Sequence, residues 1–497
     1  MRKHNSFITF LQKLSLTINN SLKKNLNKLN LKNFINIAKS NKILFTFVAL
    51  IIFSLSYFLI PNTYDKNQIN KELESQLQSK FGLKFNLSKN LKYNFFPQPH
   101  FIYKDSTFLI GQNHVSQIKD LKIYISLNNL FSLSNTKINN LILEKSNINL
   151  NKQNYNFFSK LLNQDFKNGN FILNDSNIFY RNKNDEVLFI NKIKKMKYYY
   201  DFKNLENVLE SENEVFNLPF TFRQSKKKDE KKIFSKLNLN FFKLKIKNEL
   251  DYNDYIKKGF ADITFDKIKS NMTYELNKDK LIINFFDKPT NSKFFYNGNV
   301  NFSPFYSSFN GSASEIDLFS LLSSNNLIVP LLKTEILNNK NLNFNLNIVS
   351  NKLKKYHNFV DLVLNSKIEE GLIDIDNTKV SWKNISDFKI KDSLIYLKNN
   401  ELVLDGKLDL NIKNSNAIFK FLLTPKKYRT NLKKIELDFA YNFDQNVLNL
   451  NNIKVNEQPN KYINKILKDL IFKDNKLQNK VYLKSKFNSA LKAYYAG

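Results

Sequence analysis

An uninterrupted apolar run at residues 43–60 constrains this chain more than any other feature of its sequence. The run reads ILFTFVALIIFSLSYFLI and contains no charged residue. At a rise of about 1.5 Å per residue, a helix of this length spans roughly 27 Å, close to the thickness of a bilayer core. Tyr57 lies near the distal end, where an amphipathic ring suits the membrane–water interface. The run therefore predicts a transmembrane helix, over residues 43–61.

The charges around this run predict its orientation. Residues 1–42 are rich in lysine and contain no Asp or Glu, so the positive-inside rule keeps this basic tail in the cytoplasm and translocates the rest of the chain. A cleaved signal peptide is the alternative. The basic region is much longer than a signal peptide has, and Pro61–Asp65 offers no pair of small residues for cleavage. We therefore expect a single-pass membrane protein with a cytoplasmic N-terminus.

Beyond the anchor, apolar residues recur at every second position in short runs. Four clear examples are Leu83–Leu87, Leu121–Leu127, Leu342–Ile348 and Leu437–Phe443. This alternation is typical of strands with one polar and one apolar face. Because helical segments do not alternate with these runs, we expect antiparallel pairing. The predicted fold is mainly β, with one N-terminal transmembrane helix and a few short helices. The alternation leaves open whether the strands form a long curved antiparallel sheet with a β-groove or a closed sandwich.

The expected short helices follow from apolar spacing and stop signals. In Asp65–Phe81 apolar residues recur every four positions, and Gly82 is a suitable C-cap. Three further helices are expected at Ile316–Leu332, Tyr462–Phe472 and Lys484–Tyr495.

Glycine and proline are scarce, at 9 each. Asn therefore replaces glycine as the main turn residue, because it tolerates left-handed backbone conformations. Asn297–Asn299 and Asp405–Lys407 are the two turns expected to contain glycine.

The formal net charge of +33 reflects in part a composition dominated by Lys, Asn, Ile and Phe. Their codons are rich in A and T, so lysine excess is expected from such a genome. Nucleic-acid recognition would need an arginine-rich patch, an aromatic motif, a zinc site or a basic recognition helix. None is visible, so no nucleic-acid partner is expected.

Residues for catalysis or metal binding are also missing from the sequence. There are no cysteines and only four histidines, none of which has zinc-site spacing. No nucleophile elbow, phosphate-binding loop or dinucleotide fingerprint occurs. We therefore expect no enzyme activity and no catalytic, cofactor-binding or metal-ligating residues.

The stretch after the anchor resembles the N-terminus of the AsmA family. In that family a transmembrane helix and a short helix precede a Phe-Gly step, alternating apolar residues, an aromatic–proline segment and further strands. The segments that carry this resemblance are Phe81–Leu87, Leu91–Pro99, Ile118–Leu127, Leu130–Ser132 and Ile138–Leu150. Gly311–Leu318 is similar to the family's strand-to-helix step, and Phe439–Phe443 with Val447–Leu450 to its terminal hairpins. The resemblance covers residues 43–160, and 300–455 more loosely.

The resemblance implies a periplasmic protein tied to the inner membrane of a Gram-negative bacterium. It also implies an architecture related to bridge-like lipid transfer proteins, and a role in phospholipid transport to the outer membrane and in outer-membrane biogenesis. The implied partners are inner-membrane phospholipids and a protein of the periplasm or outer membrane. On this basis the expected domains are the tail (1–42), the transmembrane helix (43–61), an N-terminal β region (62–300) and a C-terminal β region (301–497).

Two readings of the apolar strand faces stay open. They either line an open lipid groove or are sealed against a second sheet, as in a scaffold protein that assists outer-membrane assembly without carrying lipid. Periodicity cannot separate the two. The residues expected to line a groove are Phe85, Leu87, Tyr93, Phe95, Ile123, Ile125, Leu239, Phe241, Phe344, Leu346, Leu410 and Phe439.

Overall fold

The structure is a computed structural model of the chain. It describes residues 42–497 except 111–114, 129, 133, 135, 152, 183, 228–230, 252–255, 266–267, 287–293, 303–304, 318–327, 335–339, 341, 460, 468, 472–479 and 497. The basic tail expected at 1–42 lies outside the described residues apart from Lys42, as does most of the helix expected at Ile316–Leu332.

The contacts divide the chain into two compact units. Unit 1 comprises Met1–Glu72, Tyr93–Phe101 and Ile125–Lys137, and unit 2 comprises Leu73–Lys92, Ile102–Tyr124 and Ile138–Gly497. Unit 1 contains the apolar helix α3 (Lys42–Leu59) and the short 3-10 helix η1 (Ile60–Thr63). Among the described residues, one helical stretch, Thr46–Thr63, is long and apolar enough to cross a membrane.

Helix α4 (Lys66–Phe81) confirms the helix predicted directly after the anchor. It begins where the Asp65 carboxylate accepts hydrogen bonds from the backbone N–H groups of Asn67 and Gln68, at 3.0 and 2.9 Å. It ends at Gly82, whose φ of 66° is left-handed and whose N–H donates to the carbonyl of Gln78. Both ends are therefore set by local sequence.

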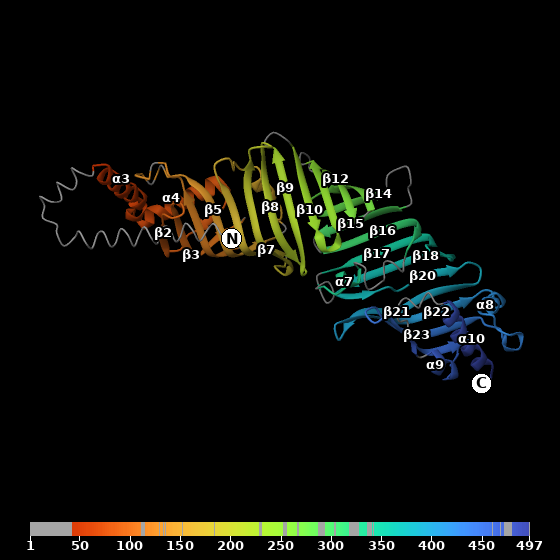
Figure 1. Cartoon of the computed structure of the whole chain (residues 1–497). Coiled ribbons are helices and arrows are strands. Elements are labelled where there is room, and N and C mark those ends of the chain that lie inside the picture. Colours follow the sequence, from red (N-terminus) through yellow and green to blue (C-terminus); the bar gives the residue numbers. More distant parts are fainter. Residues whose placement is uncertain are drawn as a thin grey trace. The chain divides into compact units, whose positions relative to one another are not determined.

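The described strands join in one sheet of 26 strands (Figure 1). The first half comprises β1 (Lys84–Asn86), β2 (Leu91–Asn94), β3 (His100–Leu109), β4 (Val115–Ile125), β5 (Ile138–Leu150), β6 (Asn170–Arg181), β7 (Val187–Asp201), β8 (Glu206–Val215), β9 (Leu218–Lys227), β10 (Lys232–Leu239), β11 (Leu244–Asp251), β12 (Lys257–Phe265) and β13 (Ile268–Leu276). The second half comprises β14 (Lys280–Phe286), β15 (Phe294–Phe302), β16 (Phe305–Ile316), β17 (Phe344–Leu353), β18 (Tyr356–Glu369), β19 (Leu372–Asp374), β20 (Lys379–Trp382), β21 (Ser386–Lys398), β22 (Glu401–Ile412), β23 (Lys434–Asn442), β24 (Val447–Val455), β25 (Gln458–Pro459) and β26 (Asp469–Ile471).

The remaining helices are short, except the last. They are α5 (Phe157–Leu161), η3 (Asn240–Phe242), α7 (Ile328–Leu332), α8 (Ser415–Leu422), η4 (Lys426–Tyr428), α9 (Lys461–Leu467) and α10 (Lys480–Ala496). The fold is thus mainly β, as the alternation predicted, and forms one long curved sheet with few helices. The helix expected at Tyr462–Phe472 is shorter than predicted, because Asp469–Ile471 instead pairs with β24 as β26.

Pairing is antiparallel between successive strands over most of the sheet, and two of the pairings whose register the structure describes are parallel. Strands β5 and β6 are parallel, and so are β16 and β17. In each case the intervening segment carries the chain back to the same end of the sheet, as a parallel step requires. The first of these segments contains α5 and the second contains α7. The sequence patterns did not predict these parallel steps.

The register keeps one face of the sheet continuous, because residues directly opposite each other share a face. One row runs from Phe171 through Tyr198, Leu209, Gln224, Ser235, Asn248 and Ala261 to Met272. Another runs from Leu276 through Leu281, Val300, Ser307, Phe344, Ile368, Ile373 and Ile395 to Leu404. We call this side the apolar face, and the other side the charged face.

Helix α4 and the α5 segment cover the N-terminal part of the apolar face. Leu77 and Phe81 of α4 are 0 % and 1 % exposed, and the Phe81 ring lies 5.9 Å from that of Phe171 on β6. The Tyr198 hydroxyl of β7 donates to the carbonyl of Phe158 in α5, at 2.7 Å. Polar contacts fix α4 further: the Glu74 carboxylate accepts from the Leu87 N–H at 2.9 Å. This part of the sheet is an ordinary closed core.

Helices also cover the C-terminal part of the apolar face. Val329 of α7 packs in a buried cluster with Ile373, Ile395, Leu402, Leu404 and Phe443. A second cluster joins residues of β23 and β24 to residues of three helices, namely Phe419 and Leu422 of α8, Ile463 and Leu467 of α9, and Ala490 and Leu491 of α10. The helix predicted at Lys484–Tyr495, α10, therefore has a packing role.

Both predicted glycine turns are wrong. Gly298 lies inside β15 and Gly406 inside β22, with strand pairing on both sides. Each glycine lies directly opposite a phenylalanine. A Cβ would lie 2.3 Å from the Phe309 ring at Gly298 and 3.1 Å from the Phe439 ring at Gly406. Close cross-strand packing therefore requires the glycine at position 298 and is tight at position 406, and neither glycine makes a turn.

Candidate apolar binding face

The part of the apolar face on strands β9–β17 forms the candidate site. We call it the central apolar face and define it by 13 side chains. They are Phe222, Leu237, Leu239, Ile246, Ile263, Met272, Tyr274, Ile283, Tyr296, Val300, Phe309, Phe344 and Leu346. Ile283 is 8 % exposed, and the other twelve are half-buried.

Half-burial distinguishes this face from the N-terminal part of the sheet, and the lack of a packed helix cluster over its described residues distinguishes it from the C-terminal part. Leu121, Leu141 and Leu173 of the N-terminal part are all 0 % exposed. Neither helix-containing cluster of the C-terminal part includes a described residue of β9–β17. Side chains of the central apolar face are therefore shielded by their lateral neighbours on the same sheet. Among the described residues, no second layer packs over them. A sandwich, which would bury them between two sheets, is not what this sheet forms.

Aromatic rings fill the face where glycines stand opposite them. Tyr274 lies opposite Gly259, Phe309 opposite Gly298, and Tyr296 opposite Gly311. In each pair a Cβ on the glycine would come within 2.4 Å of a ring atom. The rings therefore lie over the neighbouring strand and add apolar surface there.

Few polar groups interrupt this face. The Tyr274 hydroxyl donates to the Asn248 side-chain carbonyl at 2.8 Å. Burial raises the pKa of Tyr296 to about 12, so this hydroxyl stays neutral in the physiological range. Gln224, next to the α5 segment, accepts a hydrogen bond from Ser159. A neutral surface of this kind suits apolar ligands.

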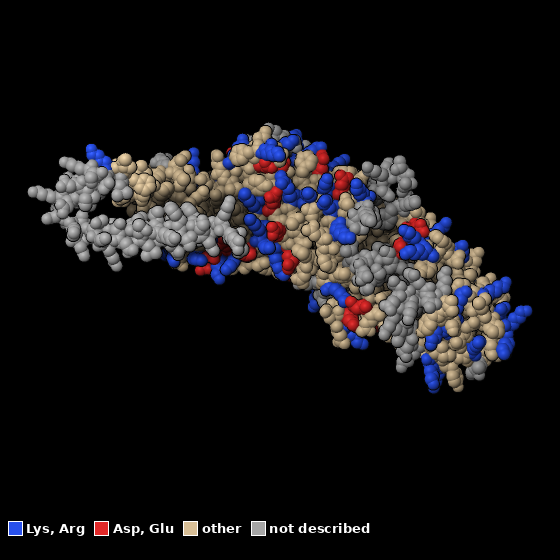
Figure 2. Space-filling model, in the orientation of Figure 1, with Lys and Arg blue, Asp and Glu red and all other residues tan. Residues whose placement is uncertain are grey.

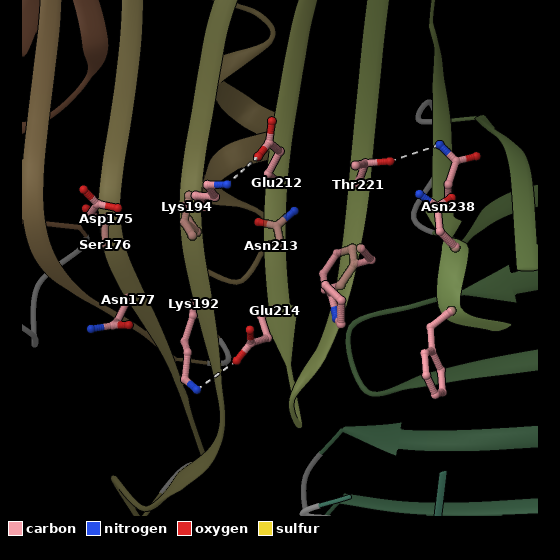
Figure 3. Close-up of a pocket in the computed structure, with 15 residues that line it drawn as sticks. Asp175, Ser176, Asn177, Lys192, Lys194, Glu212, Asn213, Glu214, Thr221 and Asn238 are labelled. Carbon is pink, nitrogen blue, oxygen red and sulfur yellow. Dashed lines mark hydrogen bonds and ion pairs between the residues drawn. The ribbon is translucent and has the colours of Figure 1, made fainter. Parts of the chain in front are cut away.

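The charged face presents paired ions over the same strands. Figure 2 shows basic and acidic side chains side by side over the part of the sheet that Figure 1 labels β7 to β10. Arg223 contacts Glu210 at 2.6 Å and Glu206 at 3.2 Å. A hollow of about 510 Å³ lies on this face, where Lys192 and Lys194 pair with Glu214 and Glu212 (Figure 3).

This hollow does not gather the groups of a reactive site. Its charges are paired across neighbouring strands, and the Asn238 amide donates to the Thr221 hydroxyl at 3.1 Å (Figure 3). Among the residues that the structure describes, no group of three or more His, Asp or Glu side chains could hold a metal ion. The charged face over β7–β9 is thus a surface of cross-strand ion pairs.

The structure separates the twelve predicted groove residues into distinct environments. Leu239, Phe344 and Leu346 lie on the central apolar face. Phe85, Leu87 and Ile123 are at most 6 % exposed in the closed N-terminal core, and Ile125, which is 2 % exposed, belongs to unit 1. Leu410 and Phe439 are half-buried at the C-terminal end, where Phe439 packs against both helix-containing clusters. Tyr93 and Phe95 belong to unit 1.

Phe241 lies away from the other predicted residues. It sits in η3 at the end of β10, is 59 % exposed and lines the hollow on the charged face. The helical turn η3 and the left-handed Lys243 that follows it interrupt the strand, so Phe241 does not continue the alternation of Leu237 and Leu239. Sequence reasoning also missed Phe222, Ile263 and Phe309, although they occupy alternating runs at Leu218–Phe222, Gly259–Phe265 and Phe305–Phe309.

No protein-family model matches the chain, and neither a curated protein nor a solved structure matches it.

Proposed function

We propose that this protein is a membrane-anchored lipid-handling protein that shields acyl chains on its central apolar face. The observation that carries the proposal is the contrast along one continuous face: closed at both ends by helices, and half-exposed over β9–β17. Acyl chains leaving a bilayer need a continuous apolar surface. Each methylene kept from water avoids a cost of about 0.8 kcal/mol.

The dimensions of the face fit an acyl chain. Neighbouring strands lie about 4.8 Å apart, so the steps from β9 to β17 measure roughly 38 Å. One leaflet contributes about half of the roughly 30 Å hydrocarbon core, which sets the length of its acyl chains. The central apolar face is therefore longer than one lipid tail, and its charged face stays in water.

The AsmA resemblance extends this proposal to a place and a direction. The charge asymmetry about the apolar helix supports a cytoplasmic tail and a translocated body. With the resemblance, this supports an inner-membrane protein of a Gram-negative cell, whose periplasmic sheet takes part in phospholipid transport to the outer membrane and in outer-membrane biogenesis. Inner-membrane phospholipids are the proposed ligands, and a periplasmic or outer-membrane protein the proposed recipient.

A scaffold protein that carries no lipid is the second candidate. It is favoured by the sealed N-terminal and C-terminal parts of the face, where helices close the core. In that case the half-exposed residues of β9–β17 would contact a protein and not a lipid.

Photo-crosslinking from adjacent residues tests the proposal. A photoreactive phenylalanine analogue replaces Leu237 or, as the matched control, its neighbour Lys236, which points to the charged face. The full chain is expressed in cells with labelled phospholipid, irradiated and purified. We expect lipid attached at position 237 and at Ile246, and none at positions 236 and 245. Equal labelling on both faces, or none on either, rejects acyl-chain shielding, and a protein adduct at 237 alone favours the scaffold.

A further inference from the structure

We propose that two uncharged loops of unit 1 insert their aromatic tips into the bilayer that holds α3. They are residues 93–101 and the described residues of 125–136 (all but 129, 133 and 135), called here the juxtamembrane loops. This insertion is a separate property from acyl-chain shielding, because it concerns how the protein contacts its membrane. It rests only on the proposed anchoring by α3.

Both loops expose large apolar side chains. Phe95 and Phe96 of the first loop are 40 % and 79 % exposed, and Leu127 and Phe131 of the second are 48 % and 66 % exposed. Soluble surfaces rarely gather so many large apolar groups in one small unit. The exposed residues therefore indicate a surface with an apolar partner.

The loops also lack charge. Residues 93–101 contain no Lys, Arg, Asp or Glu, and neither do residues 125–136, although charged residues make up 24 % of the chain. Removing a charged side chain from water into a bilayer is costly, whereas aromatic rings are favoured at the interface. The composition thus fits contact with lipid and not with an ionic protein surface.

Hydrogen bonds fix the depth of the loops on the apolar helix. The Tyr57 hydroxyl of α3 donates to the Leu127 carbonyl at 2.8 Å and accepts from the Leu130 N–H at 3.1 Å. The Tyr93 hydroxyl of the first loop donates to the carbonyl of Phe58, at 2.6 Å. Residues 57 and 58 precede the end of the apolar run at Ile60, so at about 1.5 Å per residue these contacts lie roughly 3 to 5 Å inside it.

The two loops are tied to each other as well as to the helix. The Ile125 N–H donates to the Pro99 carbonyl at 3.0 Å, and the Phe131 ring lies 5.1 Å from the Tyr57 ring. Burial raises the pKa of Tyr93 to about 12, so its hydroxyl remains a neutral donor to the helix end. The bilayer that surrounds α3 is therefore the occupant that reaches both loops at this depth.

Site-directed spin labelling tests the proposal directly. The chain contains no cysteine, so a single introduced cysteine can be labelled without background. Phe96→Cys and Phe131→Cys report on the loops, Ile52→Cys reports on the middle of α3, and Phe202→Cys, 68 % exposed in the β7–β8 turn, is the water-exposed control. Each full-length labelled chain is reconstituted in phosphatidylcholine–phosphatidylglycerol nanodiscs. Collisions with dissolved oxygen, which partitions into lipid, are compared with collisions with a water-soluble nickel chelate.

We expect the labels at 96 and 131 to collide more with oxygen than with nickel, at a depth between those of 52 and 202. A water-like result at 96 and 131 with a lipid-like result at 52 overturns the loop insertion and leaves the anchor intact. A water-like result at 52 as well overturns both. Neither outcome depends on crosslinking at Leu237, so this inference and acyl-chain shielding fail independently.

Discussion

Gly298 of β15 lies directly opposite Phe309 of β16, so close that a Cβ on the glycine would lie 2.3 Å from the Phe309 Cδ1. The pair is one of four of this kind among the described strands: Gly259 with Tyr274, Gly311 with Tyr296, and Gly406 with Phe439 complete the set. All four lie on the apolar face. Strand glycines in this chain are therefore sites where a ring crosses to the next strand.

Gly298→Ala is expected to destabilise the sheet by about 1–3 kcal/mol, because the added methyl forces the Phe309 ring and the backbone apart. The Ser308 carbonyl oxygen lies 2.9 Å from the same Cβ position, so the methyl also meets backbone that cannot rotate away as a side chain can. Urea unfolding followed by far-UV circular dichroism measures the loss. Asn299→Ala, an exposed neighbour on the same strand, serves as the control. Equal midpoints for the two variants would show that the glycine is not needed for packing.

Leu77→Ala is expected to cost about 2–5 kcal/mol, the range for a buried leucine that leaves a cavity. Leu77 is 0 % exposed in α4, whereas its neighbour Gln78 is exposed. Gln78→Ala therefore changes the same helix without touching the core and should cost less than about 0.5 kcal/mol. Hydrogen exchange of α4 amides localises the effect. Comparable losses in both variants would mean that α4 does not seal the N-terminal core.

The contribution of Asp444 to folding stability is expected to depend on pH. Burial raises the pKa of its carboxyl, but hydrogen bonds from Lys333 and from the Leu402 N–H outweigh burial and leave the pKa below its usual value. Because the folded pKa is below the unfolded one, this group stabilises the fold above the unfolded pKa of about 3.9 and ceases to do so as pH falls through the folded value.

Asp444→Asn is therefore expected to lower stability near neutral pH by about 1 kcal/mol, since the pair is partly exposed to solvent. The difference from the unmodified chain should shrink as pH falls below about 4. Chemical unfolding at several pH values measures it. Asp438→Asn, on the same hairpin, is the control. A stability difference between Asp444→Asn and the unmodified chain that stays constant with pH contradicts the lowered pKa of Asp444.

The contribution of Arg223 to folding stability is expected to depend on salt concentration. Its guanidinium contacts Glu210, Glu206 and also Asp201, the last at 3.7 Å. Arg223→Gln leaves these carboxylates facing one another, so a loss of about 1 kcal/mol is expected at low salt. Salt screens exposed pairs, so the loss should fall when ionic strength rises from about 0.02 to 0.5 M. Thermal unfolding at both concentrations checks this, and a loss independent of salt would point to packing by the arginine stem.

The β class could be predicted because alternation is a local property of the chain. The alternation of Leu437, Phe439 and Tyr441 with polar residues shows that one face of this strand is apolar, whatever the strand's position in the sheet. Helix α4 could be predicted for the same reason, because its apolar residues and the residues that cap its two ends all lie in one short stretch of sequence. The parallel step from β16 to β17 could not, because it depends on where the α7 segment returns to the sheet.

The groove residues were harder to predict, since alternation identifies a face without showing what covers it. Ile123 and Leu346 have the same pattern, yet Ile123 is 0 % exposed in the closed N-terminal core and Leu346 is half-buried on the open part. That difference arises from helices distant in sequence. Gly298 was mistaken for a turn because its need for space comes from Phe309, on the next strand.

The strand order has a consequence for how the chain acquires its structure. From β6 to β16 each strand pairs with the one that precedes it in sequence. Contacts of this local kind close short loops and are kinetically favourable. Each new hairpin can therefore add to an existing edge as the chain emerges, while the steps at β5–β6 and β16–β17 must wait for a long segment to return. Folding is expected to proceed in three stretches of growth separated by two pauses.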